Sequence, residues 1–105
     1  MDLASQHCVP CEAGTAPMTD RQADALMPEV PKWRREEQRL ARTIEHKDFR
    51  AAMRFVNKVA DLAEDQGHHP VLHIDYGKVR IELWTHNIDG LSENDFVLAA
   101  KIDRL

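Results

Sequence analysis

Residues 67–86 decide the fold, and they read GHHPVLHIDYGKVRIELWTH. Apolar and polar residues alternate on both sides of Gly77-Lys78, as they do in two half-buried strands joined by a tight turn. This stretch therefore predicts an antiparallel hairpin. Three histidines stand just outside the ends of the two strands: His68, His69 and His86.

The apolar faces of the two strands limit how they can pair. Both must face one core, and a shift by one residue would turn a strand inside out. The loop is then either Gly77-Lys78, with glycine first as a type II′ turn prefers, or Tyr76-Gly77. We predict the first, because it pairs His73 with Glu82, whereas the second places His73 beside Arg80.

The predicted register brings two of the three histidines together. His69 lies opposite His86 at a Cβ separation of roughly 5 Å, with His68 one residue away. Histidine has the unperturbed pKa nearest to neutral pH among side chains, so such a cluster suggests proton transfer or metal binding.

The chain before the hairpin predicts a short helix and two strands. Thr19 and Gln22 have the spacing of a capping box, which opens a short helix that ends at Pro28. One strand is predicted over residues 37–46, and a separate or bent strand directly after Trp33.

Two further helices frame the hairpin. The longer is predicted over residues 48–66, with Asp48 as N-cap and Gly67 as left-handed C-cap. Its apolar residues recur at helical spacing: Ala52, Phe55, Val56, Val59 and Ala63. The last helix begins after Ser92, whose spacing to Asp95 is an N-cap signature, and continues to the C-terminus.

These elements predict an α+β fold. A four-stranded antiparallel sheet carries helices packed on one face, in the order short N-terminal helix, two strands, long helix, two strands, C-terminal helix. The helix-free face would meet solvent or another subunit. Residues 1–18 lack apolar periodicity and are expected to form a flexible leader before a domain over residues 19–105.

A Cys-x-x-Cys pair, Cys8 and Cys11, lies in this leader. It could be half of a zinc site or a redox pair. A closed zinc site needs four ligands and the sequence has no second pair, so we expect a reduced pair without metal.

Composition excludes several classes of protein. A chain of 105 residues is long enough for one domain, and a net charge of −4 argues against a general nucleic-acid binder. No apolar run reaches the length of a membrane span and no signal-peptide pattern is visible. We therefore expect a cytoplasmic protein that binds neither nucleic acid directly nor a membrane.

The histidine cluster allows three interpretations. Two histidines could act as general acid and general base. Three could bind zinc, although adjacent strand residues point to opposite faces, so His68 and His69 could share an ion only if the strand begins after them. They could also be surface histidines without a function.

One family matches these residues. The run Glu64-Asp65-Gln66-Gly67-His68-His69-Pro70, followed by Tyr76, Thr85-His86 and Asp95, closely resembles the signature of the pterin-4a-carbinolamine dehydratases. The resemblance covers about Thr19 to Leu105 and shows no departure in the core motif. The leader lies outside it.

The resemblance implies an activity and a set of roles. The enzyme would dehydrate 4a-hydroxytetrahydrobiopterin to quinonoid dihydropterin by histidine acid–base catalysis, in tetrahydrobiopterin recycling. Members use no metal or organic cofactor. His68 and His86 would be the acid–base pair, and His69 would share in catalysis and mainly hold the pterin. Three further residues would support substrate binding: Glu64, Thr85 and Asp95.

The resemblance also implies partners. Members form homodimers or homotetramers and serve aromatic amino acid hydroxylases. Animal members also act as dimerisation cofactors for a homeodomain transcription factor. The alternative function is therefore a non-catalytic protein-binding or dimerisation module of the same fold.

Overall fold

The computed structural model describes residues 2–9 and 14–105. Within them, four strands form one antiparallel sheet in the order β1-β2-β4-β3. The strands are β1 (Arg34–Glu36), β2 (Arg39–Glu45), β3 (Val71–Asp75) and β4 (Lys78–Leu83). The α-helices are α1 (Asp20–Leu26), α2 (Phe49–Gln66) and α3 (Glu93–Ile102). Short 3₁₀ helices are η1 (Leu3–Ser5), η2 (Met27–Glu29) and η3 (His86–Ile88). The predicted α+β fold and order of elements are confirmed.

The start of α1 and both ends of α2 lie where their capping residues predict. Thr19 and Gln22 form the expected capping box, with the Gln22 N–H donating to Thr19 Oγ1 at 3.2 Å. The Asp48 carboxylate accepts from the Ala51 N–H at 2.8 Å and opens α2. Gly67 closes α2 with φ 64°, a left-handed conformation that glycine adopts without strain.

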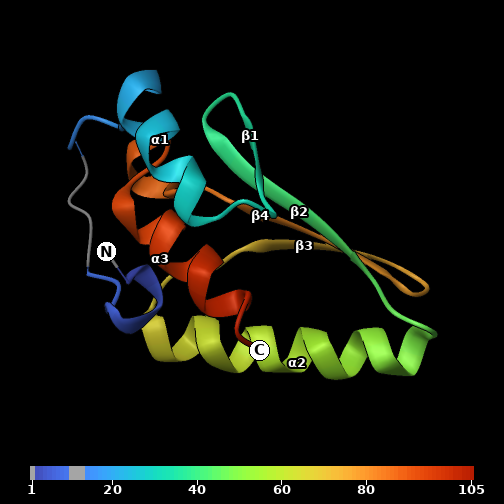
Figure 1. Ribbon diagram of the computed structural model, residues 1–105. Helices are drawn as coiled ribbons and strands as arrows, with labels where there is room; N and C mark the ends of the chain where they lie inside the picture. Colours follow the sequence, from blue (N-terminus) through green and yellow to red (C-terminus); the bar gives the residue numbers. More distant parts are fainter. Residues whose placement is uncertain (1, 10–13) are drawn as a thin grey trace.

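The hydrophobic core lies between the sheet and its helices. In Figure 1, α2 runs beneath the sheet, while α1 and α3 gather at one end of it. The fully buried side chains come from strands and helices alike: Leu40, Val79, Ile81, Leu83, Val59, Phe96 and Leu98. Burial of apolar surface on this scale is the main favourable contribution to folding.

The predicted register of the β3–β4 hairpin is wrong. The structure pairs Leu72 with Ile81 and His73 with Arg80, so the loop is Tyr76-Gly77. Tyr76 takes the left-handed conformation, with φ 49°. The Glu82 carboxylate still reaches His73, at 2.9 Å from Nε2, but along a diagonal of the sheet.

A contact outside the hairpin explains this register. The backbone of Gly77 lies against the backbone of His46, whose N–H donates to the Gly77 carbonyl at 2.7 Å. A Cβ atom at Gly77 would stand 2.4 Å from the His46 carbonyl oxygen. Glycine is therefore needed for close approach to the chain that enters α2, rather than as the first residue of a type II′ turn.

The last helix stops earlier than predicted. It ends at Ile102, and Leu105 is 47% exposed. Asp103, just beyond the helix, accepts from Trp33 Nε1 at 2.9 Å and pairs with the Arg42 guanidinium. These contacts join the end of the chain to the sheet.

The first residues pack against the domain. Leu3 is 2% exposed within the core, and Lys101 Nζ donates to the Ala4 carbonyl at 2.8 Å. The boundary before the domain at residues 19–105 stays a prediction. Within the described part of the expected leader, however, η1 packs along α3.

The two cysteines of the leader differ in what the structure describes. Cys8 is 6% exposed, and its Sγ lies 3.6 Å from the Asn94 carbonyl oxygen. Cys11 lies outside the described residues. The expected reduced Cys8–Cys11 pair therefore stays a prediction.

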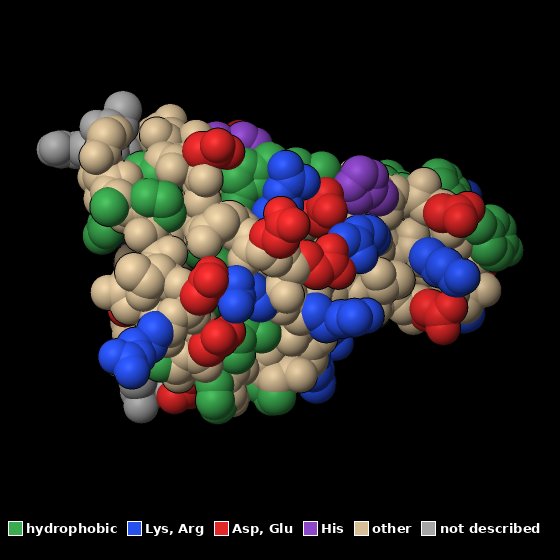
Figure 2. Space-filling view, turned by 90° about the horizontal axis from the view of Figure 1, so that it is seen from above, with side chains coloured by type: hydrophobic (Ala, Val, Ile, Leu, Met, Phe, Trp, Pro, Cys, Tyr) green, Lys and Arg blue, Asp and Glu red, His purple; other side chains and the backbone are tan. Residues whose placement is uncertain are grey.

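The helix-free face of the sheet is strongly charged. Seen from the side away from α2, Figure 2 shows basic and acidic side chains mixed over its middle. Arg80 pairs with Glu36 at 2.7 Å and with Glu82 at 3.3 Å. The hydrogen bonds to Glu36 and then to Glu82 raise the pKa of Arg80. The pKa of Glu82 is lowered, first by its hydrogen bond with His73 and then by its hydrogen bond with Arg80.

Candidate active site

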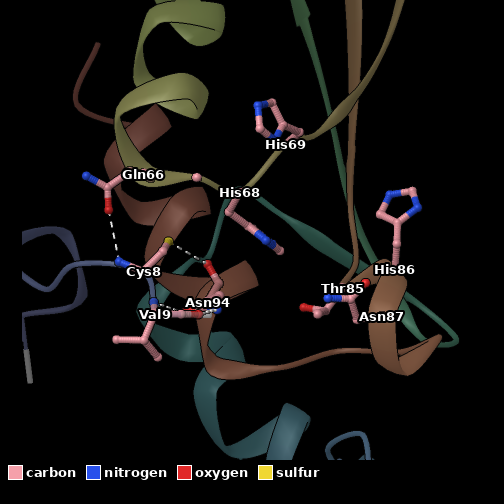
Figure 3. A pocket seen from close by; sticks show the side chains of 10 residues that line it. Cys8, Val9, Gln66, His68, His69, Thr85, His86, Asn87 and Asn94 are labelled. Carbon is pink, nitrogen blue, oxygen red and sulfur yellow. Dashed lines mark hydrogen bonds between the residues drawn. The ribbon is translucent and has the colours of Figure 1, made fainter. Parts of the chain in front are cut away.

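A pocket of about 370 Å³ opens where the end of α2, the end of β4 and the start of α3 meet (Figure 3). This is within the size range of small-molecule sites. All three histidines line it: His68, His69 and His86. They converge as residues of the connecting segments, because β3 begins only at Val71.

His68 is the most enclosed of the three. Gly67 turns the chain out of α2, and His68 follows at once with its side chain only 11% exposed. Its Nε2 lies 2.6 Å from Asp95 Oδ1. Figure 3 shows the imidazole pointing between the two sides of the pocket.

Asp95 is fully buried and completely paired. Besides His68, its carboxylate accepts from Thr85 Oγ1 at 2.9 Å and from the Ser92 N–H at 3.0 Å. A buried carboxylate is tolerated only with such partners, and the start of α3 also favours negative charge. Asp95 therefore holds His68 in one orientation.

The pairing with Asp95 also bears on which ring nitrogen of His68 carries a hydrogen. Beside an ionised Asp95 carboxylate, which can only accept, Nε2 of His68 would carry the shared hydrogen. Nδ1 is then the nitrogen that can exchange a proton with a bound molecule. The same logic applies to catalytic and metal-bound imidazoles that a carboxylate orients.

His69 forms a second pair, but in solvent. Its Nε2 lies 2.6 Å from Glu64 Oε2, from the last turn of α2. The two side chains are 60% and 79% exposed. This histidine stands at the rim of the pocket and can move more freely than His68.

His86 is held by stacking rather than by a carboxylate. Its ring lies 4.3 Å from the Trp84 ring at an interplanar angle of 28°, and the Arg39 guanidinium lies 4.0 Å from the Trp84 ring centroid. Thr85, which lies between Trp84 and His86 in the sequence, is fixed by backbone hydrogen bonds to Gly90. His86 is thereby presented to the pocket from the end of β4.

The predicted site residues fall into two groups. Thr85 lines the pocket with the three histidines. Glu64 and Asp95 each contact one of these histidines without lining the pocket themselves. The expected pairing of His69 opposite His86 on adjacent strands is wrong, because both lie beyond the strands that pair.

Sequence reasoning missed five further residues that line the pocket: Cys8, Val9, Gln66, Asn87 and Asn94. Gln66 carried a signal, since it continues the apolar spacing of Val59 and Ala63 on α2. A polar residue at a buried position needs a partner. Cys8 and Val9 carried no local signal.

Two further findings concern the described residues alone. Among them, no group of three or more histidine, cysteine, aspartate or glutamate side chains is placed to hold a metal ion. Within that same part of the chain, no helix is long and apolar enough to cross a membrane.

A buried histidine–aspartate pair beside two further histidines is an arrangement suited to proton transfer. The family model described as pterin 4 alpha carbinolamine dehydratase matches residues 16–105. The chain therefore belongs to the pterin-4a-carbinolamine dehydratase family.

Several relatives carry this name provisionally. One from Rubrobacter xylanophilus is 44% identical over 105 residues, which cover 99% of this chain and 98% of the relative. One from Methylococcus capsulatus is 42% identical, covering 98% of this chain and 92% of the relative. A crystal structure from Brucella melitensis, described as a transcriptional coactivator/pterin dehydratase, is similar with a TM-score of 0.78 and 27% identity. That match covers 84% of this chain and 96% of the other.

Proposed function

We propose that this protein dehydrates 4a-hydroxytetrahydrobiopterin to quinonoid dihydropterin and water, in support of tetrahydrobiopterin recycling. The observation that carries the proposal is the buried His68–Asp95 pair in a pocket shared with His69 and His86. Membership of the dehydratase family supports the substrate class.

The reaction needs one proton given and one proton taken. The lone pair on N5 of the pterin expels the hydroxyl from C4a, the C4a–O bond breaks, and a double bond forms between C4a and N5. An imidazolium protonates the departing oxygen, which leaves as water, and a neutral imidazole accepts the proton of N5. No net proton is consumed, and no metal or organic cofactor is required.

The neighbours of the two histidines support one assignment of these two tasks. Asp95 places a negative charge beside His68, whereas Arg39 places a positive charge near His86, across Trp84. We assign His68 as the proton donor and His86 as the acceptor.

His69 has a different role in this proposal. It stands at the exposed rim with Glu64, where its imidazole can hydrogen-bond the polar edge of the pterin. Thr85 lines the pocket and donates a hydrogen bond to Asp95. A substrate that contacts Thr85 would therefore lie against the residue that supports the partner of His68.

The test is direct measurement of dehydration. Freshly generated 4a-hydroxytetrahydrobiopterin is mixed with the protein, and its decay is followed by stopped-flow absorbance. We expect decay to be faster with the protein than without it. His68→Ala and His86→Ala should each remove most of that acceleration, about 10²-fold or more, while circular dichroism shows an intact fold. Decay at the uncatalysed rate with the unaltered protein would disprove the proposal.

The alternative is a protein-binding module, which the description of the Brucella melitensis structure as a coactivator favours. In that case both histidine variants would bind the partner normally, while changes on the charged helix-free face would weaken binding.

The family resemblance also leads us to expect a homodimer or homotetramer, to be measured by light scattering, and a link to an aromatic amino acid hydroxylase.

A further inference from the structure

Two buried amide side chains hold the N-terminal segment against the candidate active site. Gln66, the last residue of α2, accepts from the Cys8 N–H at 2.9 Å through Oε1. Asn94, in the first turn of α3, accepts from the Val9 N–H at 3.0 Å and donates to the Val9 carbonyl. Cys8 and Val9, which we call the strap, are therefore bound through their backbone to two helix ends (Figure 3).

Both amide side chains are suited to this contact. Gln66 and Asn94 are only 8% and 7% exposed, and a buried amide group is costly unless it is hydrogen-bonded. The Nε2 of Gln66 donates to Asp65 Oδ2 at 3.0 Å, which leaves Oε1 to accept from the strap. The strap therefore supplies hydrogen-bond partners that these two positions need.

The segment before the strap is itself bound to the last residues of the chain. Leu3 is 2% exposed within the core. Lys101 Nζ donates to the Ala4 carbonyl at 2.8 Å, and the Arg104 guanidinium lies 2.9 Å from Asp2 Oδ1. The strap is thus the end of a segment that is held along its length, so it can restrain the residues that bind it.

The two anchors adjoin the two members of the buried pair. Gln66 precedes His68 by two residues, and Asn94 immediately precedes Asp95. His68 follows the end of α2 and Asp95 lies at the start of α3, so their 2.6 Å contact depends on how these two helix ends are placed. The strap consists of two consecutive residues, whose Cα atoms are about 3.8 Å apart. It therefore ties together the same two helix ends.

We propose that Gln66 and Asn94 are positioning residues for proton transfer. Through the strap, they hold the ends of α2 and α3 together and so keep His68 in contact with Asp95. This inference rests on the proposed function. A displacement of about 1 Å in a catalytic group can cost on the order of 10²-fold in rate, so a second link between the helix ends has a catalytic consequence. The family model begins at residue 16, so the strap lies outside the part of the chain that it matches.

The experiment removes the anchoring amide groups and keeps side chains of similar length. Asn94→Leu and Gln66→Met are made singly and together, and Asn57→Leu, at an exposed position on α2, is the control. Each single variant should lower kcat for dehydration about five- to tenfold, with KM within about twofold of the unaltered value. The control should change neither value.

The double variant tests whether both anchors act through the strap. If loss of either anchor releases the strap, the double variant should have a kcat within about twofold of the single variants, because the second change has nothing further to release. If each anchor acts only on its own neighbours, the two losses should multiply. Multiplied losses would overturn the inference.

A spectroscopic measurement separates positioning from stability. The proton shared by His68 Nε2 and Asp95 Oδ1 should give a strongly deshielded NMR signal in the unaltered protein, assigned by its absence in His68→Gln. Both single anchor variants should speed the exchange of this proton with water by about tenfold or more. A lower thermal midpoint with unchanged kcat and unchanged exchange would mean that the anchors are merely structural, and it would overturn the inference.

The same signal keeps this inference apart from the proposed function. If the unaltered protein does not accelerate dehydration, the proposed function fails. Faster exchange of the shared proton in the anchor variants would still support the positioning, and unchanged exchange would refute it. If neither variant folds, amide exchange in the unaltered protein decides. The N–H groups of Cys8 and Val9 should exchange at least about tenfold more slowly than in an unstructured chain, and unprotected exchange would refute the inference.

Discussion

Two histidine–carboxylate pairs in this molecule have the same length and different surroundings. His68 with Asp95 and His69 with Glu64 both measure 2.6 Å between nitrogen and oxygen. The first pair is buried, with side chains 11% and 0% exposed, and the second is 60% and 79% exposed. Burial strengthens an electrostatic contact and makes an unpaired group costly, whereas solvent screens it. Distance alone therefore does not tell which pair matters.

The largest effect is expected from Asp95→Asn. The amide keeps the size of the side chain but loses the charge, and it can donate to His68, which would place the proton of the imidazole on the wrong nitrogen. We expect kcat for dehydration to fall about 10²-fold or more, and the free energy of unfolding to fall by about 2 kcal/mol.

The matched control for this change is Glu93→Gln, an exposed carboxylate in the same first turn of α3. It should leave kcat within about twofold of the unaltered value, as surface substitutions usually do. If Asp95→Asn retained full kcat, the buried pair would be purely structural and the contrast between the two pairs would disappear.

The next effect tests how the buried pair is supported. Thr85→Val keeps the shape of the side chain but removes the hydroxyl that donates to Asp95. The free energy of unfolding should fall by about 1–2 kcal/mol, seen as a lower thermal midpoint, with a several-fold loss of kcat. Thr43→Val is the control, because Thr43 is an exposed residue of β2. Equal midpoints for the two variants would show that the hydroxyl adds nothing.

A third pair, His73 with Glu82, lies between these extremes and tests the effect of pH. The hydrogen bond from His73, and then Arg80, lowers the pKa of Glu82 below its ordinary value of 4.5. A carboxyl whose folded pKa is depressed stabilises the fold above its unfolded pKa, and this contribution is lost as pH falls through the folded value.

Glu82→Gln should therefore lower the thermal midpoint by about 2–4 °C at neutral pH. The difference from the unaltered protein should shrink as the pH drops below about 4.5. Thermal unfolding between pH 3 and pH 7, with roughly equal steps, measures this difference. A constant difference over that range would mean that the charge of Glu82 is not involved.

The sequence predicted those features that depend on neighbours along the chain. Capping residues such as Thr19, Asp48 and Gly67 act within a few positions of themselves, so the helix ends that they define were found. The clustering of His68, His69 and His86 was also found, because these residues flank the ends of one hairpin.

Features that depend on distant contacts were not predicted correctly. The hairpin register follows from the close approach of Gly77 to His46, which charge pairing within the hairpin cannot show. Val9 is held by hydrogen bonds with Asn94, and no residue near Val9 in the sequence indicates such a partner. Contacts between distant parts of the chain therefore decide both the register of the hairpin and the position of Val9.

The smallest effect is expected at the exposed pair. In Glu64→Gln, His69 keeps a hydrogen-bonding neighbour and loses only a solvent-screened charge, so kcat should be unchanged and KM should rise by no more than about twofold. That small rise should vanish in 1 M salt, where screening shortens the range of charges to about 3 Å. KM measured at low and high salt, with Asp61→Gln on α2 as an exposed control, decides the matter. A loss of kcat as large as that of Asp95→Asn would mean that exposure is no guide to function at this site, and that His69 rather than His68 transfers the proton.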